Sequence, residues 1–135
     1  MSDELLQDAQ RAYQEGRHAD AARLFQDVLG TNPAHIPALY GLGVIHFQGS
    51  QFGQAENLFG ETERLDPLFA DGACMRGVTL VRLGRPDDAL AAFDRALAVR
   101  PDFIEALSNH ATTLLELGRY REGLEELDRV LLLDP

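Results

Sequence analysis

The sequence predicts an all-α protein made of repeated helical hairpins, and two observations lead to this fold class. First, four prolines recur at intervals of 34 residues: Pro33, Pro67, Pro101 and Pro135. A fixed period between about 20 and 50 residues is typical of repeat architectures. Second, apolar residues recur three and four positions apart, as on one face of a helix, and no stretch alternates long enough for a strand. Four repeats of two helices each are therefore expected.

The eight expected helices follow one another in pairs. Their ranges are 3–15, 18–31, 34–48, 52–65, 68–82, 86–99, 102–116 and 120–133. Asn32 and Asp66 are expected to cap the helices that follow them, with Pro33 and Pro67 at the first helical position, where a missing N–H is tolerated. Pro37 and Pro86 fall in first turns as well, so neither proline breaks a helix. The turn inside each hairpin carries, in order, Gly16, Ser50, Gly84 and Gly118.

Small residues at equivalent positions explain how each hairpin closes. In the first helices these are Ala9, Gly43, Gly77 and Ala111, and in the second helices Ala21, Ala55, Ala89 and Gly123. Phe25, Phe59 and Phe93 lie beside them at the same period. A mid-helix glycine costs about 1 kcal/mol relative to alanine, so Gly43 and Gly77 are expected to lie where two helices approach closely.

This pattern resembles the tetratricopeptide repeat, a helix–turn–helix unit of the same length with small residues at the crossing, an aromatic in the second helix and a proline near its end. The repeats would be 2–35, 36–69, 70–103 and 104–135, in one domain spanning 1–135. No copy has the family's tryptophan; Leu5, Leu39, Ala73 and Leu107 stand there instead. The resemblance implies a right-handed α-solenoid that works in protein–protein interaction.

The resemblance also implies a concave groove lined by the first helices. The matching groove residues are Leu6, Gln10, Tyr13, Tyr40, Val44, Phe47, Gln48, Cys74, Val78, Val81, Arg82, Ser108, Thr112 and Leu115. Its centre would be apolar, which suits a peptide or helix ligand. The alternative is that these side chains only pack one helix against another. Arg82 could meet an acidic ligand group, or form a surface ion pair with Asp71 or Glu116.

Two specialised ligand classes of the family are not expected. Binding of a chaperone's acidic tail needs basic and asparagine side chains at set groove positions, which here hold Leu6, Gln10, Gly41, Asp71 and Met75. Asp71 would repel a carboxylate. The asparagine ladder of O-linked sugar transferases would need Asn at four positions, which hold Gln7, Gly41, Met75 and Asn109.

The composition disfavours several further classes of protein. A net charge of −10, with no lysine among the 12 basic residues, disfavours nucleic-acid binding. No apolar run reaches the ~18 residues of a membrane span, and the N-terminus has no signal-like apolar stretch. Cys74 is the one cysteine, which fits a reducing, cytoplasmic setting.

No enzymatic chemistry is expected, and with it no cofactor and no metal. The four histidines, His18, His35, His46 and His110, lack metal-ligand spacing. His46 and His110 are expected to serve packing or helix ends. Cys74 lies mid-helix without a nearby histidine, as a small buried hydrophobe would.

The C-terminal sequence Val130–Leu133 is apolar, and no polar capping segment follows it. Terminal repeats normally need a polar outer face. The sequence therefore favours a module of a longer protein, or self-association through this last helix. The expected function is a protein–protein interaction module. The alternative is a substrate-recruiting or assembly arm of a multidomain enzyme, since such repeats often precede bacterial transferase domains.

Overall fold

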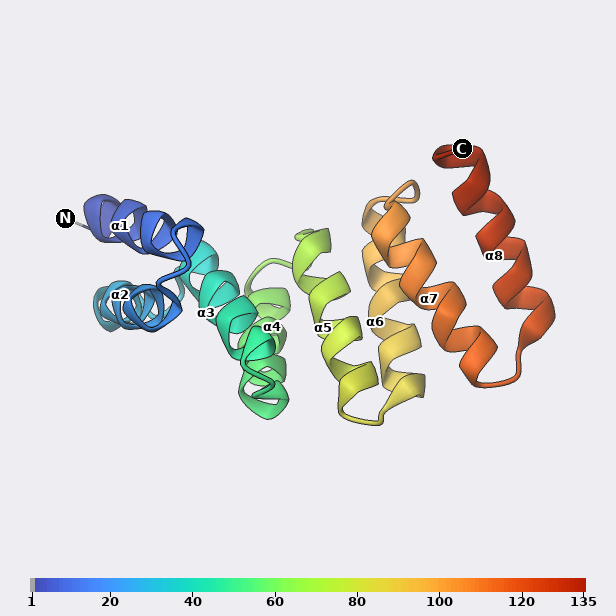
Figure 1. The fold of residues 1–135 in the computed structure, drawn as a ribbon, viewed down its shortest axis with the longest axis horizontal. Helices are drawn as coiled ribbons and strands as arrows, with labels where there is room; N and C mark the ends of the chain where they lie inside the picture. The colour runs from blue at the N-terminus through green and yellow to red at the C-terminus, as the bar shows by residue number, and fades with distance from the viewer. Residues whose placement is uncertain (1) are drawn as a thin grey trace. The chain divides into compact units, whose positions relative to one another are not determined.

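The computed structural model describes residues 2–135, and within them it contains eight α-helices and no strand (Figure 1). The helices are α1 (Ser2–Gln14), α2 (His18–Thr31), α3 (Ile36–Gln48), α4 (Phe52–Leu65), α5 (Ala70–Arg82), α6 (Pro86–Val99), α7 (Ile104–Glu116) and α8 (Tyr120–Leu133). The predicted all-α fold class is confirmed.

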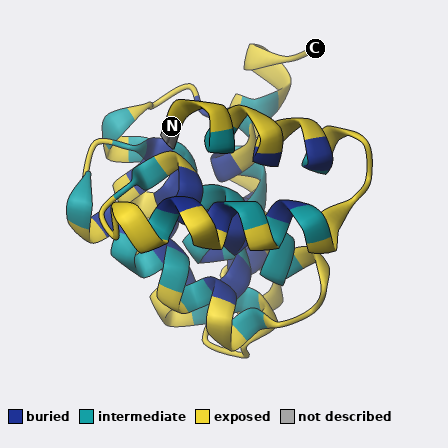
Figure 2. Cartoon of the chain, turned by 90° about the vertical axis from the view of Figure 1, so that its left-hand side faces the viewer, coloured by how far each residue is buried: buried dark blue, intermediate teal, exposed yellow. Residues whose placement is uncertain are grey.

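The helices form hairpins in chain order, and the hairpins group into two compact units. The first unit ends at Asp66 and holds α1–α4, and the second begins at Pro67 and holds α5–α8. Within each unit the second helix of one hairpin packs on the first helix of the next, α2 on α3 and α6 on α7. Each unit is thus a stack of two hairpins. Buried residues, coloured dark blue in Figure 2, lie on the packed sides of the helices.

The tight helix crossings predicted from glycine are present. A Cβ placed on Gly43 would lie 2.7 Å from Cε1 of Phe59, and one on Gly77 would lie 2.5 Å from Cε1 of Phe93. Real Cβ atoms do not approach carbon so closely, so the glycines make room for the phenylalanine rings. Both rings are fully buried. The 34-residue period therefore repeats a packing unit as well as a sequence.

The predicted caps at the start of α3 and α5 are wrong. Asn32 is the C-cap of α2, and its side chain accepts a hydrogen bond from Ala34 N at 3.2 Å. The N-cap of α3 is His35, whose Nδ1 accepts from Ala38 N at 3.3 Å. Likewise Asp66 ends α4, while Phe69 is the N-cap of α5.

The repeat prolines explain the difference. Pro33 and Pro101 each lie in a turn, closed by hydrogen bonds of 3.1 Å from His35 N to Asn32 O and from Phe103 N to Arg100 O. Proline suits the second position of such a turn. The helices α3, α5 and α7 consequently begin two residues later than predicted, whereas the predicted bounds of all four second helices are confirmed. Pro37 and Pro86 do lie in first turns, as predicted.

The turn inside each hairpin requires a left-handed backbone at one residue. Gly16, Gly84 and Gly118 have φ of 79°, 75° and 82°. Ser50 occupies the same place in the second hairpin with φ of 60°. A serine there bears a strain that glycine avoids, because its Cβ crowds the backbone at positive φ.

Candidate protein-interaction surface

In the first unit, the predicted groove residues lie on α1 and α3, and the structure brings two of them into direct contact. Gln48 Nε2 donates a hydrogen bond of 2.7 Å to the hydroxyl of Tyr13. This bond links the ends of α1 and α3 through residues 35 positions apart. Tyr13, Tyr40, Val44, Phe47 and Leu6 are half-buried, whereas Gln10 and Gln48 are exposed.

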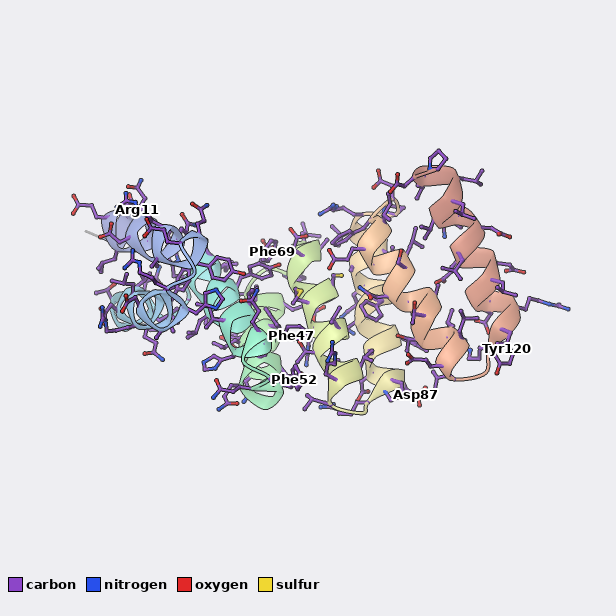
Figure 3. The ribbon with its side chains drawn as sticks, in the orientation of Figure 1. Arg11, Phe47, Phe52, Phe69, Asp87 and Tyr120 are labelled. Atoms are coloured by element: carbon purple, nitrogen blue, oxygen red, sulfur yellow. The ribbon has the colours of Figure 1, made fainter. Side chains whose placement is uncertain are left out.

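Each aromatic ring of this surface packs against another aromatic or imidazole ring. Tyr13 stacks on His18 with ring centroids 5.1 Å apart. Tyr40 tilts against Phe59 at 5.7 Å, and Phe47 meets Phe52 edge-on at 5.3 Å (Figure 3). One side of each ring therefore packs against its own unit, which fixes the orientation of the ring. The part that stays exposed can meet a ligand at little cost in side-chain entropy.

In the second unit, the predicted groove residues lie on α5 and α7. Val78, Val81, Ser108 and Leu115 are half-buried, and Arg82 and Thr112 are exposed. Thr112 Oγ1 donates to the carbonyl of Ser108 at 2.8 Å along α7. Leu115 fills the space beside Gly123 of α8, where an added Cβ would lie 2.8 Å from its Cδ2. Leu115 thus takes part in closing its hairpin.

Cys74 is the predicted groove residue that the structure contradicts. It is 1% exposed and belongs to the core of the second unit together with Ala70, Ala73 and Phe103. Burial raises the pKa of its thiol to about 12, and the negative charges of Glu105 and Asp71 add to the shift. The neutral thiol suits this apolar site and is not accessible to a ligand. Cys74 is thus a small buried hydrophobic residue, which was the other interpretation of it from the sequence.

Asp71 forms an ion pair with Arg100. Arg100 Nη1 lies 3.4 Å from Asp71 Oδ1. The same guanidinium lies 4.0 Å above the ring of Phe103, a cation–π contact. Arg100 therefore connects the start of α5 with the turn before α7 inside the second unit.

The histidines are structural, as predicted for His46 and His110. His46 Nδ1 and Gln51 Oε1 are 2.5 Å apart at the end of α3. His110 is buried between two carboxylates, with Nε2 2.9 Å from Asp94 Oδ1 and Nδ1 2.5 Å from Glu126 Oε1. It also meets Phe93 edge-on. Within residues 2–135 no group of three or more acidic, histidine or cysteine side chains is arranged to hold a metal ion.

One exposed apolar surface was only partly foreseen. Tyr120, Leu124, Leu131, Leu132 and Leu133 of α8 are all exposed. A hollow of about 260 Å³ adjoins them, lined by Pro101, Asp102, Arg129, Leu132 and Leu133. The sequence signalled the C-terminal leucines but gave no sign of Tyr120 and Leu124, because which flank of a helix is covered depends on its neighbours.

Comparison with known proteins identifies the family. The sequence model of the tetratricopeptide repeat matches residues 12–71 and 80–135, most of the chain. The chain belongs to the tetratricopeptide repeat family. No helix among residues 2–135 is both long and apolar enough to cross a bilayer.

Two curated relatives are about one third identical to this repeat protein over the residues that align. A CTR9 homolog protein of Arabidopsis thaliana is 35% identical over 95 residues, 69% of this chain and 9% of the relative. Protein C of the cellulose synthase 2 operon of Komagataeibacter xylinus is 32% identical over 93 residues, 67% of this chain and 7% of the relative. The repeat domain thus spans less than a tenth of either relative.

Solved structures of MamA have the same fold. One aligns with a TM-score of 0.93 and 20% identity, covering 98% of this chain and 78% of that one. The MamA fragment of Desulfovibrio magneticus RS-1 aligns at 0.92 with 18% identity, covering 99% and 76%. At such identities the likeness concerns the fold alone.

Proposed function

We propose that this tetratricopeptide repeat domain is a protein–protein interaction module that holds a peptide or helix against its first helices. The observation that carries the proposal is the set of oriented, half-buried aromatic rings on α1 and α3, namely Tyr13, Tyr40 and Phe47. Aromatic side chains held rigid at a surface are common anchors of binding energy. Membership of a family of interaction scaffolds supports the same conclusion.

The charge of the chain suggests the chemistry of the ligand. With a net charge of −10, the protein attracts basic segments and repels acidic ones. The apolar residues on α1 and α3 would take apolar side chains of the ligand, and Gln10 and Gln48 would offer amides to its backbone. In the second unit, Val78, Val81 and Arg82 of α5 would offer ligand contacts of their own. Cys74 is not part of it, because it is buried.

Selection of ligands from a random peptide library displayed on phage, followed by calorimetric titration of synthetic peptides, tests this proposal. Tyr40→Ala and Phe47→Ala are expected to weaken binding of the selected peptides at least about tenfold, as loss of aromatic anchors does. Leu132→Ala, at an 83% exposed position on α8, is the control and is expected to bind like the original chain. Helical circular dichroism checks that each variant is folded. Unchanged affinity of both aromatic variants would contradict the proposed site.

A second candidate role is favoured by the coverage of the relatives. Because the matched region makes up 9% and 7% of the two curated relatives, the module could act as the recruiting or assembly arm of a larger protein. Its partner would then be a substrate or subunit brought to another domain. Fusing the module to an unrelated reporter enzyme tests this: a peptide substrate carrying a selected sequence should be processed faster by the fusion, and the Tyr40→Ala fusion should lose that gain.

A further inference from the structure

Among the residues that the structure describes, no other helix of the second unit covers the outward face of α8. The same face of α6, one repeat earlier, is covered by α7. Leu90 of α6 is 6% exposed, whereas its equivalent Leu124 is 56% exposed. Leu97 is half-buried, whereas its equivalent Leu131 is 62% exposed. Side chains that a neighbouring helix covers on α6 are therefore exposed to solvent at the equivalent positions of α8.

Three exposed side chains define this face, which we call the α8 stripe: Tyr120, Leu124 and Leu131. Their spacings of four and seven residues place them on one line along the helix. Tyr120 is 63% exposed and lies at the first turn of α8 (Figure 3). The stripe is about three turns long, so the complementary surface is one helix lying along it.

The opposite end of the chain does not supply that helix. In α7 the residues that face α6 include Ala106, His110 and Thr113, all buried. The equivalent residues of α1 are Glu4, Asp8 and Arg11, which are exposed, and the last two form a surface ion pair at 3.5 Å. A charged α1 face against the apolar α8 stripe would lose solvation without gaining partners, so head-to-tail stacking of copies is disfavoured.

We propose that the α8 stripe is the interface of a symmetric dimer, in which α8 of one copy packs antiparallel against α8 of a second copy. The proposal is independent of the ligand surface on the first helices. In the register that best matches apolar residues, Tyr120 of each copy lies opposite Leu131 of the other, and Leu124 opposite Leu127. A two-fold interface has to be self-complementary in this way.

Charge supports the second copy as the occupant. Arg121 and Asp128 are exposed and lie seven residues apart along one flank of the stripe. A two-fold axis perpendicular to the helices brings equal flanks together, so Arg121 of each copy lies beside Asp128 of the other. In the apolar register the two are offset by two residues, about 3 Å along the axis, which an arginine side chain spans. Two opposite-charge pairs therefore border the apolar contact, whereas parallel packing about a two-fold axis would bring opposite flanks together and form neither pair.

The size of the α8 stripe determines how strong a dimer is expected. A face one helix wide is smaller than the ~800 Å² that each partner buries in a standard interface. We therefore expect a reversible dimer with a dissociation constant in the micromolar range, about 1–100 μM. Such a dimer is populated in concentrated protein and is resolved by sedimentation equilibrium over a range of concentrations.

The first test replaces the apolar contact. Leu124→Glu combined with Leu131→Glu is expected to weaken the dimer at least about tenfold, because four carboxylates would be placed in the interface. Leu68→Glu is the matched control, since Leu68 is 74% exposed and lies outside α8; its dissociation constant should stay within about twofold of the original. Circular dichroism and thermal unfolding confirm that the variants are folded.

The second test decides the register. Arg121→Asp and Asp128→Arg each place like charges beside one another at two points, and each is expected to weaken the dimer about 3- to 10-fold. The double variant restores opposite charges and should recover an affinity within about threefold of the original. The two residues are about 10 Å apart on their own helix, so recovery has to arise between copies.

Three results would overturn the proposal. A chain that stays monomeric up to millimolar concentration shows that copies do not pair and leaves the stripe to a helix of another protein. A dimer that persists in the double leucine variant has its interface elsewhere. Failure of the double charge variant to recover affinity rules out the antiparallel pairing.

Discussion

At the scale of single residues, the fold depends on where Cβ atoms are absent. Gly43 and Gly77 admit a phenylalanine ring against the helix backbone, at distances that a Cβ could not share. By contrast, a Cβ on Gly53 in α4 would meet nothing within 4 Å. Glycine costs helix stability at all these places. Only where a ring fills the vacated space does the packing offset that cost.

This contrast predicts opposite effects for one substitution at two sites. Gly77→Ala is expected to lower the free energy of unfolding by about 1–3 kcal/mol, because the added methyl overpacks the ring of Phe93. Gly53→Ala is expected to raise it by about 0.5–1 kcal/mol, through helix propensity alone. Urea unfolding followed by circular dichroism measures both. A stabilised Gly77→Ala variant would show that the crossing of α5 and α6 can accommodate a methyl group beside Phe93.

Ser50 allows a second test of backbone conformation. A side chain at positive φ costs roughly 1–2 kcal/mol, and the greater freedom of glycine in the unfolded chain offsets part of the gain from removing it. Ser50→Gly is thus expected to raise the free energy of unfolding by about 0.5–1 kcal/mol. The converse change, Gly84→Ser, should lower it by a similar amount, because Gly84 has φ of 75°. Equal stability of all three proteins would contradict the strain at Ser50.

The buried thiol of Cys74 predicts both slow reaction and a pH effect. At pH 8 its reaction with a disulfide reagent should be at least about a hundredfold slower in the folded chain than in urea, because access and ionisation are both suppressed. With the pKa raised to about 12 by burial, the thiol stays neutral in the folded state while the unfolded thiol ionises above pH 9.

Unfolding then releases a proton, so the free energy of unfolding should fall as the pH rises from 9 towards 12. Cys74→Ala is the control: its decrease over the same pH range should be smaller, because that proton is no longer released. Parallel pH profiles for the two proteins would assign the loss of stability to other groups.

At the scale of helices, the sequence determined the second helices well and the starts of the first helices poorly. Helical periodicity and the hairpin glycines were enough to place α2, α4, α6 and α8. The error before α3 arose because asparagine followed by proline suits both a helix cap and a turn. The hydrogen bond from His35 N to Asn32 O shows that Asn32 and Pro33 form a turn. The residues around them do not by themselves distinguish such a turn from a helix cap.

His110 connects three helices and allows a prediction about burial. Both of its ring nitrogens lie within hydrogen-bond distance of carboxylate oxygens, one on α6 and one on α8. The side chain of Glu126 is 19% exposed and that of Asp94 is 67% exposed. Glu126→Gln is therefore expected to cost about 1–2 kcal/mol of unfolding free energy, and Asp94→Asn less than about 0.5 kcal/mol. Chemical unfolding measures both, and equal losses would show that burial does not set the strength of these contacts.

At the scale of the whole chain, the 34-residue period was sufficient for the fold, because each repeat encodes the same hairpin and the same crossing. The ligand surface was predictable only as a set of positions. The burial of Cys74 and the use of Leu115 to fill space beside Gly123 depend on side-chain packing that one sequence does not reveal. Of the α8 stripe, the sequence indicated Leu131 but not Tyr120 and Leu124, since their exposure follows from the lack of a covering helix in their unit.

The net charge of the chain predicts how salt affects the proposed dimer. Two copies of charge −10 repel each other over a distance of about 30 Å at 10 mM salt, and over only about 8 Å at 150 mM. The Arg121–Asp128 contacts act over about 4 Å, within the screening length at both concentrations, so they weaken less than the repulsion does. We therefore expect the dimer to tighten about 3- to 10-fold between these salt concentrations in sedimentation equilibrium.

The double variant Arg121→Asp/Asp128→Arg, with unchanged net charge, should follow the same trend, whereas Arg121→Asp alone, at −12, should respond more steeply. A dimer that weakens steadily with salt would mean that the local charge pairs outweigh the repulsion between whole chains.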